Sequence, residues 1–72
     1  MLLREVDSTA ILTVAYDKDE KLMWLRFTSG DLYEYRGVEQ QVVQNLLEAE
    51  SKGHFVQENI KDKYDYEKVE EE

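Results

Sequence analysis

The sequence predicts an α+β fold in which a three-stranded antiparallel sheet is covered on one face by helices. Three patterns indicate this fold: runs of β-branched and aromatic residues, polar or Gly-containing turns between them, and helical apolar spacing further along the chain. The expected strands are residues 9–16, 21–27 and 32–36, and the expected helices are residues 39–50 and 52–59. A sheet with one apolar face needs a cover, so we expect both helices to pack against that face.

The first strand is predicted from the run AILTVAY, in which Leu12, Val14 and Tyr16 alternate on one side. Residues 1–7 begin with two leucines and become polar, so they are expected to be a partly ordered lead-in. The polar segment 17–20 predicts a turn into the second strand. The strands therefore follow one another as a meander with no crossover.

A tight turn at Ser29 and Gly30 joins the second and third strands, and its length decides which side chains share a face. If these two residues alone form the loop, Phe27 faces Leu32, and the opposite face carries Trp24, Arg26, Tyr33 and Tyr35. The tyrosines would then be available to a partner.

A bulge beside the glycine gives the second possible register, which we favour. It pairs Phe27 with Tyr33 and Leu25 with Tyr35, and it places Arg26 opposite Glu34 and Trp24 opposite Arg36. The apolar side chains then gather on one face and the charged pairs on the other, which avoids burying charge.

The two helices are predicted from apolar spacing and from one capping residue. Val42, Val43, Leu46 and Leu47 recur at the spacing of an amphipathic helix, and Ser51 is a favourable N-cap for a second, short helix. The predicted core consists of Val14, Tyr16, Met23, Leu25, Phe27, Tyr33, Tyr35, Val43, Leu46, Leu47, Phe55 and Ile60.

Composition narrows the function classes. The chain of 72 residues is expected to form a single domain, and it has no cysteine, so disulfides and thiolate metal sites are excluded. His54 is its single histidine and stands at no diagnostic distance from a nucleophile, so we expect no enzyme activity, no metal and no cofactor. No apolar run is long enough to cross a membrane, and a cytoplasmic protein is expected.

The charge is strongly negative, with 17 acidic residues against 9 Lys and Arg and a net charge of −8. This balance disfavours binding through the phosphate backbone of nucleic acid. Part of the excess lies at the end of the chain, where residues 67–72 are expected to form a disordered acidic tail because like charges repel and bury nothing.

Several residues taken together make the chain resemble the KTSC domain family. They are Ser8, Tyr16-Asp17, Phe27, Gly30, Tyr33-Glu34-Tyr35, Gly37-Val38, Leu46-Leu47, Ser51-Lys52-Gly53, Phe55 and Ile60. The resemblance covers residues 6–66, and the family takes its name from the C-terminus of some lysyl-tRNA synthetases, although it also occurs as small stand-alone bacterial and phage proteins. It implies a compact α+β domain, for which RNA binding has been suggested.

Two functional hypotheses follow. In the first, the protein is a non-catalytic interaction module that binds a protein partner or itself through the outer sheet face, using Trp24, Arg26 and Arg36. In the second, it is an RNA- or tRNA-binding accessory domain, as the resemblance implies, with Lys52, His54, Lys61 and Lys63 as the phosphate contacts.

Overall fold

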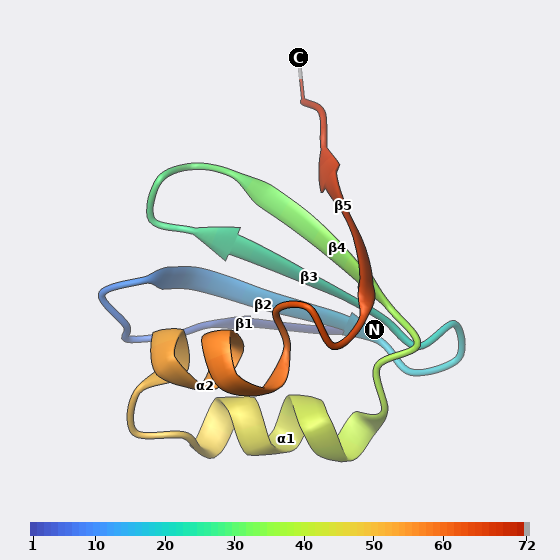
Figure 1. Ribbon diagram of the computed structural model, residues 1–72, viewed down its shortest axis with the longest axis horizontal. Coiled ribbons are helices and arrows are strands. Elements are labelled where there is room, and N and C mark those ends of the chain that lie inside the picture. The colour runs from blue at the N-terminus through green and yellow to red at the C-terminus, as the bar shows by residue number, and fades with distance from the viewer. Residues whose placement is uncertain (72) are drawn as a thin grey trace.

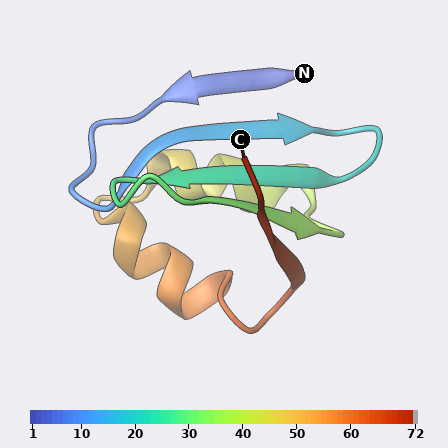
Figure 2. The same cartoon turned by 90° about the horizontal axis from the view of Figure 1, so that it is seen from above.

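The computed structural model describes residues 1–71 as a single sheet packed against two helices (Figure 1). The elements are β1 (Leu2–Glu5), β2 (Ile11–Asp17), β3 (Leu22–Phe27), β4 (Leu32–Arg36), α1 (Gln40–Glu48), α2 (Lys52–Asn59) and β5 (Asp65–Val69). All neighbouring strands are antiparallel, and their order in the sheet is their order in the chain. Both helices lie on one side, and Figure 2 looks onto the other, uncovered side, which we call the outer face.

The predicted three-stranded sheet is wrong, because β1 and β5 extend it at both edges. The segment expected to be a lead-in forms β1, in which Leu2 lies opposite Tyr16. Residues 67–72 were expected to form a disordered tail, but residues 67–69 belong to β5. In this strand Tyr66 lies opposite Tyr35, and Val69 lies opposite Leu32. β5 satisfies backbone groups that β4 would otherwise expose along its edge. The overall α+β class agrees with the structure, and residue 72 lies outside the described residues.

A bulge in β2 changes which residues of that strand face the helices. The register shifts between Ile11 and Thr13, so that Ile11 lies opposite Phe27 while Val14 lies opposite Leu25. Ile11 and Val14 are both fully buried. The prediction that Leu12 shares one side with Val14 and Tyr16 is therefore wrong: Leu12 is 47% exposed, because the bulge breaks the two-residue alternation.

The β3–β4 hairpin adopts neither of the two predicted registers. Its loop has three residues, 28–30, and is closed by Phe27 N–H, which donates to the Asp31 carbonyl at 2.9 Å. Gly30 has φ +99°, a conformation that favours glycine. Leu25 consequently lies opposite Tyr33, and Trp24 lies opposite Glu34 rather than Arg36. The favoured register was wrong by two residues, a shift that keeps every side chain on its predicted face.

The core lies between the sheet and the helices. Its buried residues are Ile11, Val14, Tyr16, Met23, Leu25, Tyr35, Val38, Val43, Leu46, Val56 and Ile60. Four residues predicted for the core, namely Phe27, Tyr33, Leu47 and Phe55, are half-buried and pack against it. The Tyr16 hydroxyl donates to the buried Val38 carbonyl at 2.6 Å, which ties β2 to the start of α1.

The helices are shorter than or equal to their predicted ranges. α1 begins one residue later and ends two residues earlier than expected, and Glu39 at its N-cap makes no side-chain capping bond. α2 spans the predicted residues, and the Ser51 hydroxyl accepts from His54 N–H at 3.3 Å. Within residues 1–71, no helix is both long and apolar enough to cross a membrane.

α2 approaches the start of β2 closely. A Cβ added at Gly53 would lie 2.9 Å from the Ala10 Cβ, a separation that real side chains do not adopt. Glycine at this position therefore sets the distance between α2 and the sheet, and with it the width of the space beside α2.

Candidate functional site

The outer face carries a row of residues that crosses the whole sheet. The cross-strand pairs place Leu3, Ala15, Trp24, Glu34 and Glu67 side by side, one from each strand. Leu3 is 70% exposed, and Trp24 is half-buried at the centre of the row. The β1–β3 half of this row is apolar, and the β4–β5 half is charged.

The indole of Trp24 is held by a polar network on the charged half. Its Nε1–H donates to Glu34 Oε1 at 3.2 Å, and the other oxygen of Glu34 accepts from Arg36 Nη1 at 3.2 Å. Arg36 Nη2 also lies 3.6 Å from Glu67 Oε1 on β5. Arg36 therefore links the carboxylates of two strands, and Glu34 fixes the orientation of the indole.

Arg26 is engaged with the end of the chain. Its guanidinium donates to the Gly30 carbonyl at 2.8 Å and to Glu71 Oε2 at 2.8 Å. In Figure 2 the end of the chain overlaps the sheet in projection, and the hydrogen bond from Arg26 places Glu71 on the outer face. The hydrogen bond from Arg26 lowers the pKa of the Glu71 carboxyl, and the same bond raises the pKa of Arg26.

The structure thus places all three predicted interaction residues on the outer face, and each makes hydrogen bonds within the chain. The apolar surface on this face consists of the indole and the apolar half of the row, above all Leu3. Sequence reasoning missed Leu3, since it became part of the outer face only through the pairing of β1 with β2.

A second feature, which the sequence did not predict, is a groove of about 590 Å³ on the helix side of the sheet. We call it the aromatic groove. It is lined by Thr9, Ala10, Phe27, Thr28, Ser29, Asp31, Tyr33, Tyr35, Gly53, Val56, Gln57, Lys61 and Tyr66. Its volume lies within the range typical of ligand pockets.

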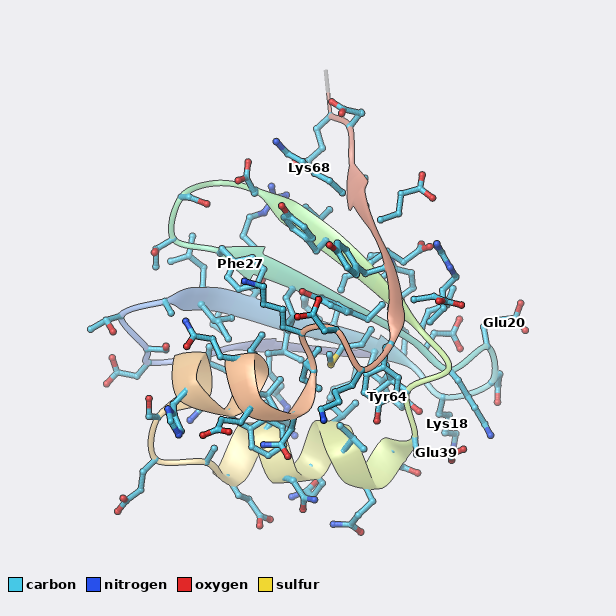
Figure 3. The ribbon with its side chains drawn as sticks, viewed as in Figure 1. Lys18, Glu20, Phe27, Glu39, Tyr64 and Lys68 are labelled. Atoms are coloured by element: carbon cyan, nitrogen blue, oxygen red, sulfur yellow. The ribbon has the colours of Figure 1, made fainter. Side chains whose placement is uncertain are left out.

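Four aromatic rings form one wall of the aromatic groove. The ring of Phe27 meets that of Tyr33 edge-on at a centroid distance of 5.7 Å, and Tyr66 lies 5.9 Å from Tyr33 and 5.8 Å from Tyr35. Figure 3 shows Phe27 at the end of β3, and the groove lining also includes residues of α2. Burial raises the pKa of Tyr35 to about 12, with the neighbouring phenols Tyr33 and Tyr66 adding to the shift.

Charge enters the aromatic groove at the β3–β4 turn and at the end of α2. Asp31 Oδ1 lies 3.4 Å from Lys68 Nζ, and Asp31 also receives a hydrogen bond from the Ser29 hydroxyl at 3.3 Å. In Figure 3 the Lys68 side chain leaves β5 on the side of this turn. Lys61 supplies the other charge on the lining.

The four residues predicted to contact RNA have different surroundings. Lys52 donates to the Ala49 carbonyl at 3.0 Å, and His54 Nε2 lies 2.9 Å from Glu58 Oε1. Lys61 lines the aromatic groove, and Lys63 lies exposed in the turn that leads to β5. Within residues 1–71, no cluster of three or more His, Cys, Asp or Glu side chains is arranged to hold a metal ion.

Comparison with known proteins identifies relatives across most of the chain. The model of the KTSC domain matches residues 7–64. A protein from Tsukamurella paurometabola is 40% identical over 62 residues, which cover 86% of this chain and 92% of the relative. An uncharacterised protein from Stutzerimonas stutzeri is 42% identical over 53 residues, which cover 72% of this chain and 75% of the relative.

One solved structure shares the whole arrangement of elements. The crystal structure of a KTSC domain protein from Yersinia pestis superposes with a TM-score of 0.91 at 33% sequence identity, and the match covers 96% of this chain and 97% of the other. A similarity this extensive includes both edge strands and both helices.

Proposed function

This chain belongs to the KTSC domain family, and from that premise we propose that it is a non-catalytic interaction module that binds a protein surface through its outer face. The observation that carries the proposal is the position of Trp24, half-buried in the middle of the sheet face that no helix covers. Trp is favoured at the centres of protein interfaces because it buries a large area at low entropic cost.

The apolar half of the outer face supports the same proposal. Leu3 is 70% exposed and lies in the same row as Trp24, with only Ala15 between them. A partner covering these three side chains would remove apolar surface from water, at roughly 25 cal/mol per Å². The charges on β4 and β5 would surround this contact as a polar rim.

The chain has few of the thiol and imidazole side chains that commonly act as nucleophiles and general bases, which supports the non-catalytic part of the proposal. The chain has no cysteine, and its single histidine, His54, is exposed on α2 and paired with Glu58. His54 lies outside the lining of the aromatic groove, so it is not placed to act as a general base on a molecule held there. A cytoplasmic location also remains part of this proposal.

A second copy of the chain is the first partner to test. Trp24 is the single tryptophan, so its fluorescence reports on the outer face alone. We expect sedimentation velocity to show a dimer as concentration rises, together with a blue shift of the Trp24 emission. Leu3→Glu should abolish both changes, because it places a charge within the apolar half.

The matched control is Gln41→Glu, which adds the same charge at an exposed position on α1. It should leave association unchanged. If the wild type stays monomeric, the same two variants are compared in a pull-down from lysate. A wild type that remains monomeric, and whose captured proteins are equally retained by Leu3→Glu, would refute the use of this face.

RNA binding is the second candidate function. The tyrosines and Lys61 of the aromatic groove favour it, since aromatic side chains stack on unpaired bases. The matches support the family but give no support to an association with lysyl-tRNA synthetases. Net charge and the internal partners of Lys52 and His54 weigh against a phosphate-binding patch.

Titration with labelled tRNA at low and moderate salt separates the two candidates. Binding that weakens with salt and is lost in Lys61→Glu, but kept in Lys18→Glu, would favour RNA. Lys18 is an exposed lysine in the β2–β3 turn, so it matches the change in charge at a distance from the groove. Absence of binding at low salt would exclude this candidate.

A further inference from the structure

The far edge of β5 is a second surface, which shares only Glu67 with the row around Trp24. β5 is the last strand of the sheet, and within residues 1–71 no further strand pairs with it (Figure 1). An edge strand presents backbone N–H and C=O groups along one side, and an extended peptide can pair with them. The geometry therefore offers a site for one added strand.

The side chains of β5 give the two sides of this edge different chemistry. Asp65, Glu67 and Val69 point to the outer side, whereas Tyr66 and Lys68 point to the helix side. Asp65 is exposed, and the side chain of Glu67 is 74% exposed. Arg36 on β4 lies opposite Asp65 and 3.6 Å from Glu67, so it offsets part of this charge. The two carboxylates still outnumber this one cation, and the outer side of the edge is acidic.

The helix side of the edge is aromatic. Tyr66 is 48% exposed and lines the aromatic groove together with Tyr33 and Tyr35. The charge of Lys68 is offset by Asp31 at 3.4 Å. A sixth strand would extend the wall formed by Tyr66, so that its inward side chains lie beside an aromatic surface.

We propose that the edge of β5 binds an extended peptide in which basic residues alternate with apolar or aromatic ones. Backbone hydrogen bonds to β5 hold the peptide as a sixth strand. Its basic side chains lie on the outer side beside Asp65 and Glu67, and its apolar side chains lie beside Tyr66. Charge complementarity and the alternation of β5 select this partner.

A second copy of the chain does not fit the same edge. Antiparallel pairing of β5 with itself, centred on Glu67, places that carboxylate opposite its own copy. Centred on Tyr66, the pairing places Asp65 opposite Glu67 of the other chain. Like charges directly opposite each other destabilise a strand pair, so the acidic row disfavours these two registers of self-pairing while it attracts a basic partner.

The other edge of the sheet supplies an internal comparison. β1 is shorter than β5 and carries Arg4 and Glu5 in place of an acidic row. A peptide that merely seeks any unpaired edge would use β1 and β5 alike. The proposed peptide discriminates between them.

The test uses the full chain and a short fluorescein-labelled peptide that alternates Lys with Val and Phe. We expect saturable binding by fluorescence anisotropy and amide chemical-shift changes concentrated in Asp65–Val69. A peptide with the same residues but its lysines grouped together should bind more weakly, as should a version N-methylated at alternate backbone positions, which removes the edge hydrogen bonds.

A matched pair of protein variants isolates the acidic row. Asp65→Asn/Glu67→Gln should weaken binding about fivefold or more through the loss of two cross-strand charge contacts. Asp7→Asn/Glu50→Gln removes the same charge at exposed positions outside β5 and should leave the affinity unchanged. Circular dichroism checks that both variants keep the fold.

Several outcomes would overturn the proposal. They are equal weakening by the two double variants, equal binding of the grouped-lysine peptide, shift changes at β1 instead of β5, and no binding of the alternating peptide at low salt. A tRNA that displaces the peptide from Asp65–Val69 would assign the edge to nucleic acid instead. Trp24 emission should not shift to the blue on peptide binding, because the peptide does not cover the indole, which keeps this site separable from the outer-face contact.

Discussion

Replacing Tyr16 with phenylalanine removes one hydroxyl from the best-defined buried hydrogen bond of the fold. The Tyr16 hydroxyl donates to the Val38 carbonyl at 2.6 Å, and the two residues are 4% and 0% exposed. Tyr16→Phe leaves this carbonyl without a partner in the core. An unsatisfied buried acceptor costs about 1–3 kcal/mol.

That cost is a large share of the stability of a small domain. At roughly 0.05–0.15 kcal/mol per residue, the free energy of unfolding of this chain is about 4–11 kcal/mol. A loss near the middle of the expected range, about 2 kcal/mol, should lower the melting temperature by about 10 °C. In urea the midpoint should fall with an unchanged slope, because the surface exposed on unfolding is the same.

The matched control for this measurement is Tyr66→Phe. The Tyr66 side chain is 48% exposed, so loss of its hydroxyl should change stability by less than about 0.5 kcal/mol. Urea unfolding followed by circular dichroism at 222 nm compares the two variants. Equal stability of the two would mean that the Val38 carbonyl reaches water, and the reasoning would fail.

Three further perturbations test the backbone and the core. Gly53→Ala should destabilise the fold by about 1 kcal/mol, because overpacking outweighs the gain in helix propensity. Adding Ala10→Gly should restore this loss, because it removes the Cβ that the new side chain would meet at 2.9 Å. A Gly53→Ala variant more stable than wild type would contradict this contact. Asp62 has φ +66°, so Asp62→Gly should stabilise by roughly 0.5–1 kcal/mol in urea unfolding, whereas Asp62→Ala should not. The pKa of Tyr35 is raised to about 12 from its ordinary value of 10.0, so the unfolded chain loses the phenol proton at a lower pH than the folded chain does. The contribution of Tyr35 to stability is therefore complete below pH 10 and falls between pH 10 and 12. Tyr35→Phe should reduce that fall when unfolding in urea is measured across this pH range.

For the β3–β4 hairpin, the favoured prediction placed each side chain on the correct face of the sheet, but it paired the two strands in the wrong register. Alternation in LMWLRF and LYEYR was sufficient for the faces, since each strand has one apolar side. The register depends on the loop, where Phe27 N–H bonds to Asp31 and Gly30 takes φ +99°. Three registers are compatible with the same sequence, and only the backbone conformation of the loop selects among them.

The edge strands escaped prediction for a different reason. Every residue of β5 from Asp65 to Lys68 is exposed. The strand therefore has no buried side and lacks the alternation of apolar and polar residues by which a strand is recognised. Its stability comes from backbone pairing with β4 and from the contacts of Tyr66 with Tyr33 and Tyr35. From composition alone, a segment with this many Glu residues is predicted to be a disordered acidic tail.

The outer-face site was partly accessible from the sequence, whereas the aromatic groove was not. The alternation on β3 placed Trp24 on the outer face, but the partner of its Nε1–H, Glu34, followed from the register. The groove forms only because β5 pairs with β4 and because Gly53 lets α2 approach the sheet. Both are tertiary contacts between segments far apart in the chain, so local sequence patterns do not show them. Phe27 and Tyr33 were assigned to the core, and both are half-buried on the groove wall.

The order of the strands in the sheet has a consequence for how fast the chain folds. Because β1 to β4 follow one another through short turns, each of these pairings closes only a small loop and can form early. The pairing of β4 with β5 closes a longer loop, because both helices lie between the two strands in the chain. The chain contains no proline, so no slow peptide-bond isomerisation interrupts this sequence of events, and docking of the last strand should set the pace at which the native state is completed.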